Sequence, residues 1–453
     1  MTDYLDRMSK FASEVTYKDM DENVKESARN VIMDTIGAIL GGSRLPENGN
    51  LARLVNNNLE HGTATIIGHA FKASPMMATL ANATAGVCLE MDEGNRLGGG
   101  HPAIHILPGV LSVAEEMGMG GQKLIEGLVA GYEVSSRIGG ATKTRPNVHS
   151  HGTWGTIGTA VAVARLFNFH ADQMRQVINL ATSMSPANSW TPCFEGATIR
   201  NIYPGRSGMQ GILAVHLQQC GFTSLHDAPM DMYTTILGDD FDSEAAVSGL
   251  GSTKLRIEKN YFKFHACCLY NHPILDAVEA LVAREKFGYS DIDYIEITTV
   301  PFSARMAQNY PSNTLSAKFH IPFAVAALLV TGKTDITAFN PDVIRNDLIM
   351  DVANQVKVNT DPNMHMLRSD YPCATVSIGL KSGNILTEST TFVRGDFANR
   401  RPYSELTDKF LFLASPVLGN AKSRKALQTI NSLEIIEDIR DFTSILKGIA
   451  KGC

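Results

Sequence analysis

Apolar residues recur every three to four positions through most of the first 264 residues, the spacing of helices that bury one face. Glycine-containing loops separate these stretches and mark where each helix is expected to end. The pattern predicts helices at Tyr4–Leu40, Pro75–Leu89, Ala103–Met117, Gly121–Gly139, Thr159–Leu166 and Met209–Cys220.

The pattern changes in the next part of the chain, where short runs rich in β-branched residues predict strands. These runs are Ile295–Val300, Val356–Val358 and Ala374–Leu380. Helices are predicted between them at Pro273–Lys286 and His320–Thr331, and helical spacing returns from Tyr403 to Leu446.

These elements predict a mostly α protein with two kinds of domain. We expect a helical domain over residues 1–264 and an α+β domain over residues 265–395. The helices of residues 396–453 are expected to rejoin the first domain. With 453 residues the chain is too long for one ordinary core, which favours two domains.

Composition and charge narrow the class of protein. A chain that is 44% hydrophobic and 19% charged is typical of a soluble globular protein. No apolar run approaches the ~20 residues of a membrane-spanning helix, so no membrane association is expected. The formal net charge of −6 and the lack of a basic stripe argue against nucleic acid as a partner.

The chain is expected to be cytoplasmic. Residues 1–10 are polar and charged and lack the apolar segment of a secretion signal. The seven cysteines form no CxxC pair and no zinc-binding spacing, which fits reduced thiols.

One acidic stretch is the most informative in the chain. Glu90, Asp92 and Glu93 precede three consecutive glycines, and His101 then stands directly before Pro102. Proline suits the first position of a helix, so His101 is expected at a helix N-terminus, where backbone N–H groups face an anion. Carboxylates, a histidine and a helix start are the parts of an acid/base site for an anionic substrate.

Two later loops carry further candidate chemistry. His149 and His151 stand in a glycine-rich loop before a predicted helix, and their spacing also suits zinc ligands, although no third ligand lies at a telling distance. Arg200 and Arg206 flank a Pro-Gly turn before another helix. An arginine presents a planar fork that binds carboxylates through two hydrogen bonds.

Taken in order, these segments resemble the MmgE/PrpD family, which includes 2-methylcitrate dehydratases, cis-aconitate decarboxylases and iminodisuccinate epimerases. The resemblance covers essentially the whole chain. It rests on the acidic cluster before His101-Pro102, Ile106-Leu107-Pro108, a histidine before Gly152–Gly158, the stretch ahead of Pro204-Gly205, Cys267–His272 and Arg401–Phe410.

The resemblance implies a fold, an assembly and a partner. The fold is an all-helical domain formed by both chain ends, with an inserted α+β lid domain and a cleft between them. The assembly is a homodimer. The partner is a small-molecule carboxylate substrate, and no metal ion or organic cofactor is required.

Carried over position by position, the resemblance implies five catalytic residues. They are His101, His149, His272, Asp92 and Glu90, with Glu90 standing where an aspartate is usual in the family.

The chain departs from the family at two places. Arg200 and Tyr203 occupy positions where the family commonly has a lysine and, three residues later, a histidine, and Phe323 stands where a tyrosine is common. An arginine is effectively always charged and acts as a clamp, and a phenylalanine donates no proton. We expect Arg200, Tyr203 and Phe323, with Arg206 and Arg145, to bind the substrate.

These residues predict a cofactor-independent lyase. His101 or His149 would remove a proton α to a carboxylate of a small di- or tricarboxylate, and His272, Asp92 or Glu90 would help water leave, as in a 2-methylcitrate dehydratase. Decarboxylation and epimerisation share the carbanion-like intermediate and stay open as alternatives.

Two other classes of function also stay open. A metal-dependent hydrolase would use His101, His149 and His272 with an acidic residue. A catalytically altered member of the family would bind a ligand without turnover. His105, four residues after His101, is expected to be a buried, hydrogen-bonded structural residue.

Overall fold

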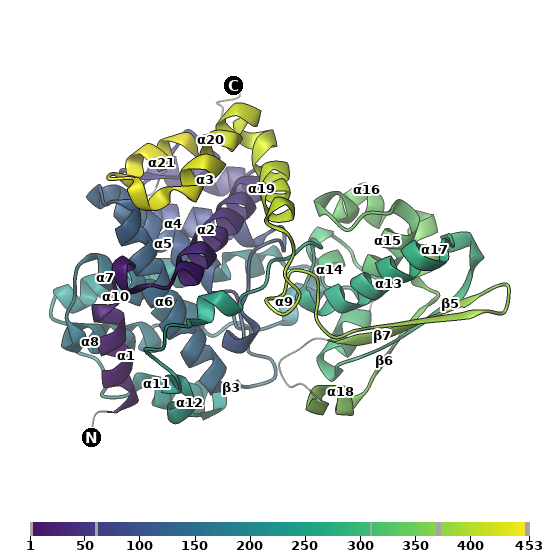
Figure 1. Ribbon diagram of the computed structural model, residues 1–453, viewed down its shortest axis with the longest axis horizontal. Coiled ribbons are helices and arrows are strands. Elements are labelled where there is room, and N and C mark those ends of the chain that lie inside the picture. Colours follow the sequence, from purple (N-terminus) through teal and green to yellow (C-terminus); the bar gives the residue numbers. More distant parts are fainter. Residues whose placement is uncertain (1–2, 59–61, 309, 368–372, 449–453) are drawn as a thin grey trace.

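The computed structural model describes residues 3–58, 62–308, 310–367 and 373–448. Figure 1 shows two lobes: a helical lobe, which contains the first part of the chain and the C-terminal helices, and an α+β lobe from the middle of the chain. The mostly α fold class predicted from the sequence is confirmed, with strands confined to small sheets.

In the described residues, the helical lobe has twelve α-helices before the α+β lobe and three after it. The first part contains α1 (Tyr4–Glu14), α2 (Glu22–Gly42), α3 (Pro46–Asn58), α4 (Pro75–Val87), α5 (Pro102–Met117), α6 (Gly121–Ala141), α7 (Trp154–Leu166), α8 (Ala171–Ser183), α9 (Thr191–Glu195), α10 (Tyr203–Gln219), α11 (Ala228–Asp231) and α12 (Ser243–Val247). The last part contains α19 (Tyr403–Leu418), α20 (Asn420–Asn431) and α21 (Ile439–Ile445). Two short antiparallel pairs, β1–β2 (Ala64–Thr65, Lys72–Ala73) and β3–β4 (Thr142–Thr144, Gly238–Phe241), complete it.

The two ends of the chain share one hydrophobic core. Leu406 and Phe410 of α19 are buried in the same cluster as Val31 and Ile39 of α2. Burying these side chains removes apolar surface from water, which stabilises the contact by roughly 25 cal/mol per Å². The C-terminal helices therefore pack onto the N-terminal ones, as Figure 1 shows for yellow α19 beside purple α2.

A buried ion pair joins the same two helices. Lys409 of α19 donates from Nζ to Asp34 of α2 at 2.6 Å and to the carbonyl of Met91 at 2.6 Å. Burial raises the pKa of Asp34 and lowers that of Lys409, and each opposite charge opposes the shift in its partner. The pair therefore ties α19 both to α2 and to the acidic stretch that follows α4.

The α+β lobe packs helices against one mixed four-stranded sheet. Its helices are α13 (His272–Glu285), α14 (Thr314–Lys318), α15 (Ile321–Thr331), α16 (Pro341–Ile344), α17 (Asp347–Ala353) and α18 (Pro362–Leu367). Its strands are β5 (Ile292–Thr299), β6 (Val356–Thr360), β7 (Ala374–Leu380) and β8 (Ile385–Thr390), in the order β6-β5-β7-β8. Strand β5 runs parallel to β6 and antiparallel to β7, and β7 pairs antiparallel with β8.

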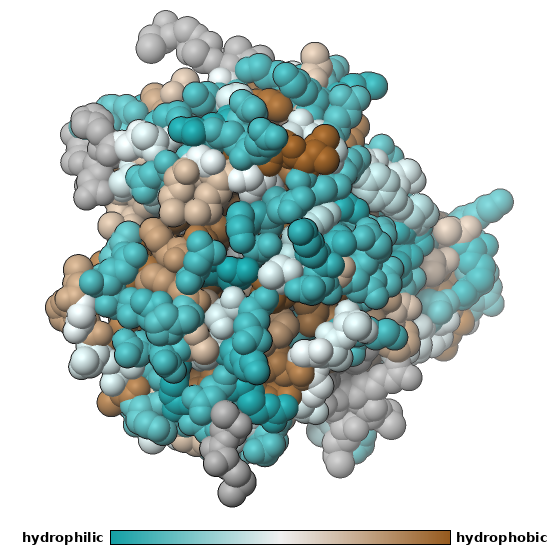
Figure 2. Space-filling view, turned by 60° about the vertical axis from the view of Figure 1, so that its left-hand side comes forward, coloured by the Kyte–Doolittle hydropathy of each residue, from teal (hydrophilic) through white to brown (hydrophobic). Residues whose placement is uncertain are grey.

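The surface combines hydrophobic and hydrophilic residues. Figure 2 shows hydrophobic patches separated by hydrophilic residues on the face turned forward. Within the described ranges, each helix is either too short or too polar to cross a membrane.

Candidate active site

A cavity of about 270 Å³ lies where the two lobes meet. It combines a charged and histidine-rich side from the helical lobe with an aromatic side that includes residues of the α+β lobe. The lining residues are Glu90, Arg96, Gly99, Gly100, His101, His149, Ser150, His151, Trp190, Arg200, Tyr261, Cys268, Leu269, Tyr270, Val300, Phe302 and Phe319.

The backbone after α4 turns sharply to deliver the acidic residues. Helix α4 ends at Val87, and Glu90 has a left-handed backbone with φ of 53°. This conformation costs a non-glycine residue roughly 1–2 kcal/mol and is often kept where function requires it. Helix α5 begins at Pro102 with His101 as its N-cap residue, as the sequence predicted.

The partly exposed His101 and the buried Asp92 form a pair in which the tautomer of the histidine is defined. Nδ1 of His101 lies 2.8 Å from the carbonyl of Glu93 and 3.0 Å from Oδ2 of Asp92. Both of these oxygens are acceptors, so the hydrogen is on Nδ1 and a neutral ring keeps its lone pair on Nε2. Nε2 lies 3.4 Å from the hydroxyl of Tyr261. His101 therefore presents a base that Asp92 orients.

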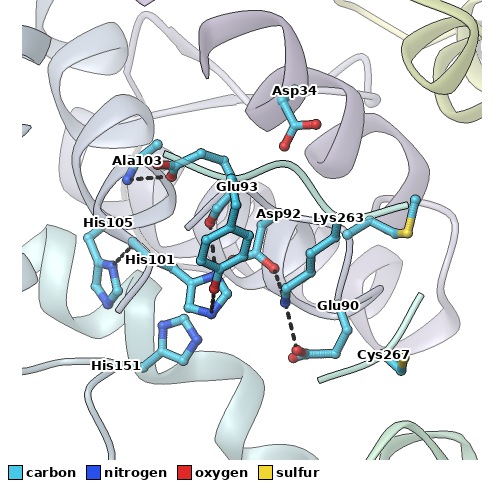
Figure 3. Close-up of polar contacts among 12 residues, drawn as sticks. Asp34, Glu90, Asp92, Glu93, His101, Ala103, His105, His151, Lys263 and Cys267 are labelled. Carbon is cyan, nitrogen blue, oxygen red and sulfur yellow. Dashed lines mark hydrogen bonds and ion pairs between the residues drawn. The ribbon is translucent and has the colours of Figure 1, made fainter. Parts of the chain in front are cut away.

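Two cations keep the acidic residues ionised. Lys263 Nζ lies 3.0 Å from Glu90 and 3.5 Å from Asp92, and Arg200 Nη1 lies 2.5 Å from Glu90. Burial alone would raise the pKa of Glu90 and of Asp92. Arg200 and Lys263 outweigh burial at Glu90 and lower its pKa. Lys263 and His101 do the same at Asp92. Figure 3 shows Asp92 between His101 and Lys263, with Glu90 beyond the lysine.

The histidines form a stack behind His101. The ring of His151 lies 4.9 Å from those of His101 and His149 and 5.1 Å from that of His105. Burial, with Arg200 next in effect, lowers the pKa of both His149 and His151 well below the usual value, so both rings are neutral at pH 7.

His149 lines the cavity and carries a buried donor without a partner among the described residues. Its Nδ1 accepts a hydrogen bond of 2.9 Å from the backbone N–H of His151, so the hydrogen of the neutral ring is on Nε2. Nε2 is buried and has no hydrogen-bond partner among the described residues. The ring packs against Trp190 at 3.8 Å, which fixes its orientation.

His105 is fully hydrogen-bonded and does not line the cavity. Its Nδ1 donates to the carbonyl of His101 at 2.8 Å, and its Nε2 accepts from the backbone N–H of Gly152 at 3.1 Å. Burial lowers its pKa to about 4. His105 is therefore a structural residue, as expected from the sequence, and it links the His101 loop to the His149 loop.

Glu93 is a buried carboxyl that stays protonated at neutral pH. Tyr132 donates to its Oε1, and the backbone N–H of Ala103 donates to its Oε2 at 3.3 Å. Burial raises the pKa of Glu93 to about 8 despite these hydrogen bonds.

Replacing Glu93 with glutamine should remove a loss of folding stability that grows as pH rises. In the unfolded chain the carboxyl titrates near the usual value of about 4.3, so the wild type loses stability as pH rises from there to about 8. The difference in Tm between Glu93→Gln and the wild type should therefore shift in favour of the variant across this window and level off above it. Thermal melts at several pH values test this, and a difference that does not change with pH would contradict it.

Several residues predicted for the site lie outside the cavity. His272 is buried behind it, with Nε2 3.2 Å from the carbonyl of Cys267. Phe323 lies in the core of the α+β lobe, between Tyr310 and Phe339.

The remaining predicted substrate-binding residues also do not line the cavity. Tyr203 packs edge-on against His149 at 5.8 Å, and Arg206 donates to Asn188 at 2.5 Å. Arg145 is exposed, 3.5 Å from Asp239. Of the ten predicted residues, the structure brings Glu90, His101, His149 and Arg200 to the cavity wall, with Asp92 directly behind His101.

The sequence matches two family domains that together span most of the chain. Residues 6–236 match the MmgE/PrpD N-terminal domain, and residues 265–435 match the MmgE/PrpD C-terminal domain. The chain belongs to the MmgE/PrpD family. The C-terminal match runs past the α+β lobe into α19 and α20, which pack on the helical lobe.

Curated MmgE/PrpD relatives match over nearly their full length at low identity. A cis-aconitate decarboxylase of Aspergillus terreus is 22% identical over 470 residues, covering 96% of this chain and 94% of the relative. The cis-aconitate decarboxylase-like protein oryM of Aspergillus oryzae is 21% identical, covering 97% and 96%. The cis-aconitate decarboxylase of Homo sapiens is 22% identical, covering 95% and 91%.

Three residues of this MmgE/PrpD site escaped the sequence analysis as catalytic candidates. They are His151, Tyr261 and Lys263, all of which are buried at or beside the cavity. Lys263 stands between Phe262 and Phe264, and a lone charge inside an aromatic run was the signal that could have identified it.

Among the described residues, two groups of histidine and acidic side chains lie close enough together to be considered as metal sites. Asp92, His101 and His151 lie close enough together, but the Lys263 ammonium lies 3.5 Å from Asp92 and would repel a metal ion there. A second group is His265, Asp276 and Glu279. Asp276 already bonds to His265 at 2.9 Å and accepts from the backbone N–H of residue 394 at 2.8 Å. Neither group fits a metal ion as it stands.

Proposed function

We propose that this protein is a lyase that acts on a small di- or tricarboxylate through acid/base chemistry of its own side chains. The observation that carries the proposal is the Asp92–His101 pair, whose histidine lines the same cavity as Arg200. The full-length likeness to relatives named as cis-aconitate decarboxylases supports the lyase class.

Arg200 and His149 would hold the substrate. Arg200 Nε is buried and has no hydrogen-bond acceptor within the described part of the chain, so it can donate to a substrate carboxylate while Nη1 stays paired with Glu90. His149 Nε2 offers a second donor. Buried donors that are otherwise unpaired favour a ligand that supplies acceptors.

His101 would carry the proton. Its Nε2 takes the proton α to a carboxylate, and the nearby Asp92 carboxylate stabilises the imidazolium that forms. Asp92 and Glu90 are ionised at pH 7 and His149 and His151 are neutral, so none of these four supplies a proton there. The imidazolium of His101 can then return the proton to a leaving hydroxyl, which completes the loss of water.

Decarboxylation is the second candidate, favoured by the names of the relatives. In that reaction a carboxylate leaves as CO₂, and protonated His101 delivers its proton to the carbanion that remains. Both reactions need the Asp92–His101 pair and the carboxylate-binding Arg200. The two activities are therefore distinguished by their products.

Proton NMR in D₂O is the direct test. The purified protein is incubated separately with citrate, 2-methylcitrate, cis-aconitate, malate, tartrate and iminodisuccinate. We expect new olefinic signals from a hydroxy acid if water is lost, or deuterated product with one carboxylate fewer if CO₂ is lost. Deuterium that enters an α-carbon without net change would indicate an epimerase. No change in any sample, from folded protein, would contradict the proposed activity.

A further inference from the structure

A second cavity of about 520 Å³ lies behind the candidate active site, again between the two lobes. Residues of α2, α14 and α19 contribute to its wall, and Figure 1 shows α19 facing α16 across this junction. Its walls are largely apolar, with Leu45, Leu315, Ile336 and Leu413 among the lining residues. Its volume falls in the range typical of small-molecule sites, about 300–1,000 Å³.

The cavity is lined by a buried lysine that can donate more hydrogen bonds than it makes. Lys318 lines it, is only 1% exposed, and donates from Nζ to the carbonyl of Cys88 at 2.8 Å. An ammonium group has three hydrogens to donate, and this is the one acceptor that the described contacts give it. Burial lowers the pKa of Lys318 to about 8, so the group remains mostly charged at pH 7.

A second polar group in the cavity also lacks a partner. Asn201 is 5% exposed, and its Oδ1 is buried with no hydrogen-bond partner within the described residues. A buried polar atom without a partner destabilises the protein, and a ligand that lets the amide form a hydrogen bond would remove this cost. Because the amide can turn over, Asn201 can present either its oxygen or its NH₂ to a ligand.

Neighbouring residues of the same two segments line the two cavities. Cys88 and Leu89 line the second cavity and Glu90 lines the first, while Arg200 lines the first and Asn201 the second. The carbonyl that Lys318 holds therefore lies two residues before Glu90, whose backbone is left-handed. A ligand bonded to Lys318 would act on the same short segment that positions Glu90.

We propose that this second cavity binds a small amphipathic monocarboxylate. Its carboxylate accepts hydrogen bonds from Nζ of Lys318 and from the NH₂ of Asn201 after the amide turns over, and its hydrocarbon chain lies against the apolar walls. The site is separate from the catalytic cavity and does not depend on the proposed reaction. A single buried cation matches one carboxylate, and the apolar surroundings favour an alkyl chain over further charged groups.

Isothermal titration calorimetry with sodium octanoate tests the proposal, because the heat of binding requires no turnover. We expect saturable binding at one site per chain. Lys318→Met should weaken it by more than about tenfold, since the carboxylate would lose its charged partner. Lys333→Met, which changes an exposed lysine of the same lobe, should leave the affinity unchanged.

Two further variants keep the test decisive if Lys318→Met fails to fold. Thr314→Trp places a large ring at the partly exposed edge of the cavity and should also abolish binding. His101→Gln alters only the catalytic cavity and should bind octanoate as the wild type does. The proposal would be overturned if octanoate gave no saturable heat of binding, or if Thr314→Trp bound it with full affinity. Loss of binding in His101→Gln would also overturn it, because octanoate would then bind in the catalytic cavity.

Discussion

Replacing His101 with glutamine should lower kcat by about 10²–10⁴-fold while the protein stays folded. Glutamine can keep a hydrogen bond to the Glu93 carbonyl or to Asp92, but its amide cannot take up a proton near neutral pH. The ring is partly exposed to the cavity, so its removal should change the free energy of unfolding by no more than about 1–2 kcal/mol. Turnover of the substrate found in the NMR panel, with a urea melt, measures both quantities.

A surface histidine provides the matched control for this variant. His216 lies on α10 and is exposed, so His216→Gln should turn over substrate at the wild-type rate. Wild-type activity in His101→Gln would remove His101 from the mechanism. A kcat loss accompanied by a large drop in stability would assign His101 a structural role instead.

Replacing Lys263 with methionine should both inactivate the protein and destabilise it. Methionine is similar in length but uncharged, so Glu90 and Asp92 would lose the cation that lies 3.0 Å and 3.5 Å from them. Removing one partner from a buried ion pair costs about 3–5 kcal/mol, because the remaining charges stay buried. The activity should fall because the pKa of Asp92 would rise and its support of the His101 imidazolium would weaken.

The destabilisation of Lys263→Met should depend on pH. A carboxylate whose pKa is lowered on folding contributes stability above its unfolded pKa of about 4, and this contribution is lost as pH falls through the folded value. Lys263→Met should therefore be most destabilised near pH 7, and its gap to the wild type should narrow as acid protonates Glu90 and Asp92. Urea melts at pH 7 and pH 4 measure the gap.

An exposed lysine in the same segment serves as the control. Lys259→Met should change the free energy of unfolding by less than about 0.5 kcal/mol, as is usual for surface substitutions. A similar small effect at Lys263 would mean that Arg200 and His101 alone compensate the two carboxylates. A gap that widens in acid would show that the carboxylates are not the groups that Lys263 supports.

Local patterns predicted the local features of this site. The proline after His101 fixed the start of α5, and β-branched runs located strands β5, β6 and β7 to within a few residues. Strand β8 was missed because its alternating pattern leaves most of its side chains partly or fully exposed. The change from helical spacing to β-branched runs also predicted a separate α+β lobe, and the family resemblance added the cleft between the two lobes.

The contacts that define the chemistry could not be read from local patterns. Lys263 meets Glu90 from 173 positions away, and His151 gains its role from a stack with three other histidines. Such contacts depend on how helices pack, which a single sequence does not reveal. The same limit applies to Arg145, which we expected to bind the substrate and which lies at the surface.

The pair between Asp34 and Lys409 has a consequence for how the protein is made. Its partners are 375 residues apart, so the ribosome releases α2 long before α19 exists. At about 5–20 residues per second, the delay is about 20–75 s. During that time the Asp34 side of α2 and the segment around Met91 lack their buried cation, so the nascent helical lobe must remain incomplete. Assembly of the acidic segment behind His101 therefore belongs to the last steps of biosynthesis, after the whole α+β lobe has been translated.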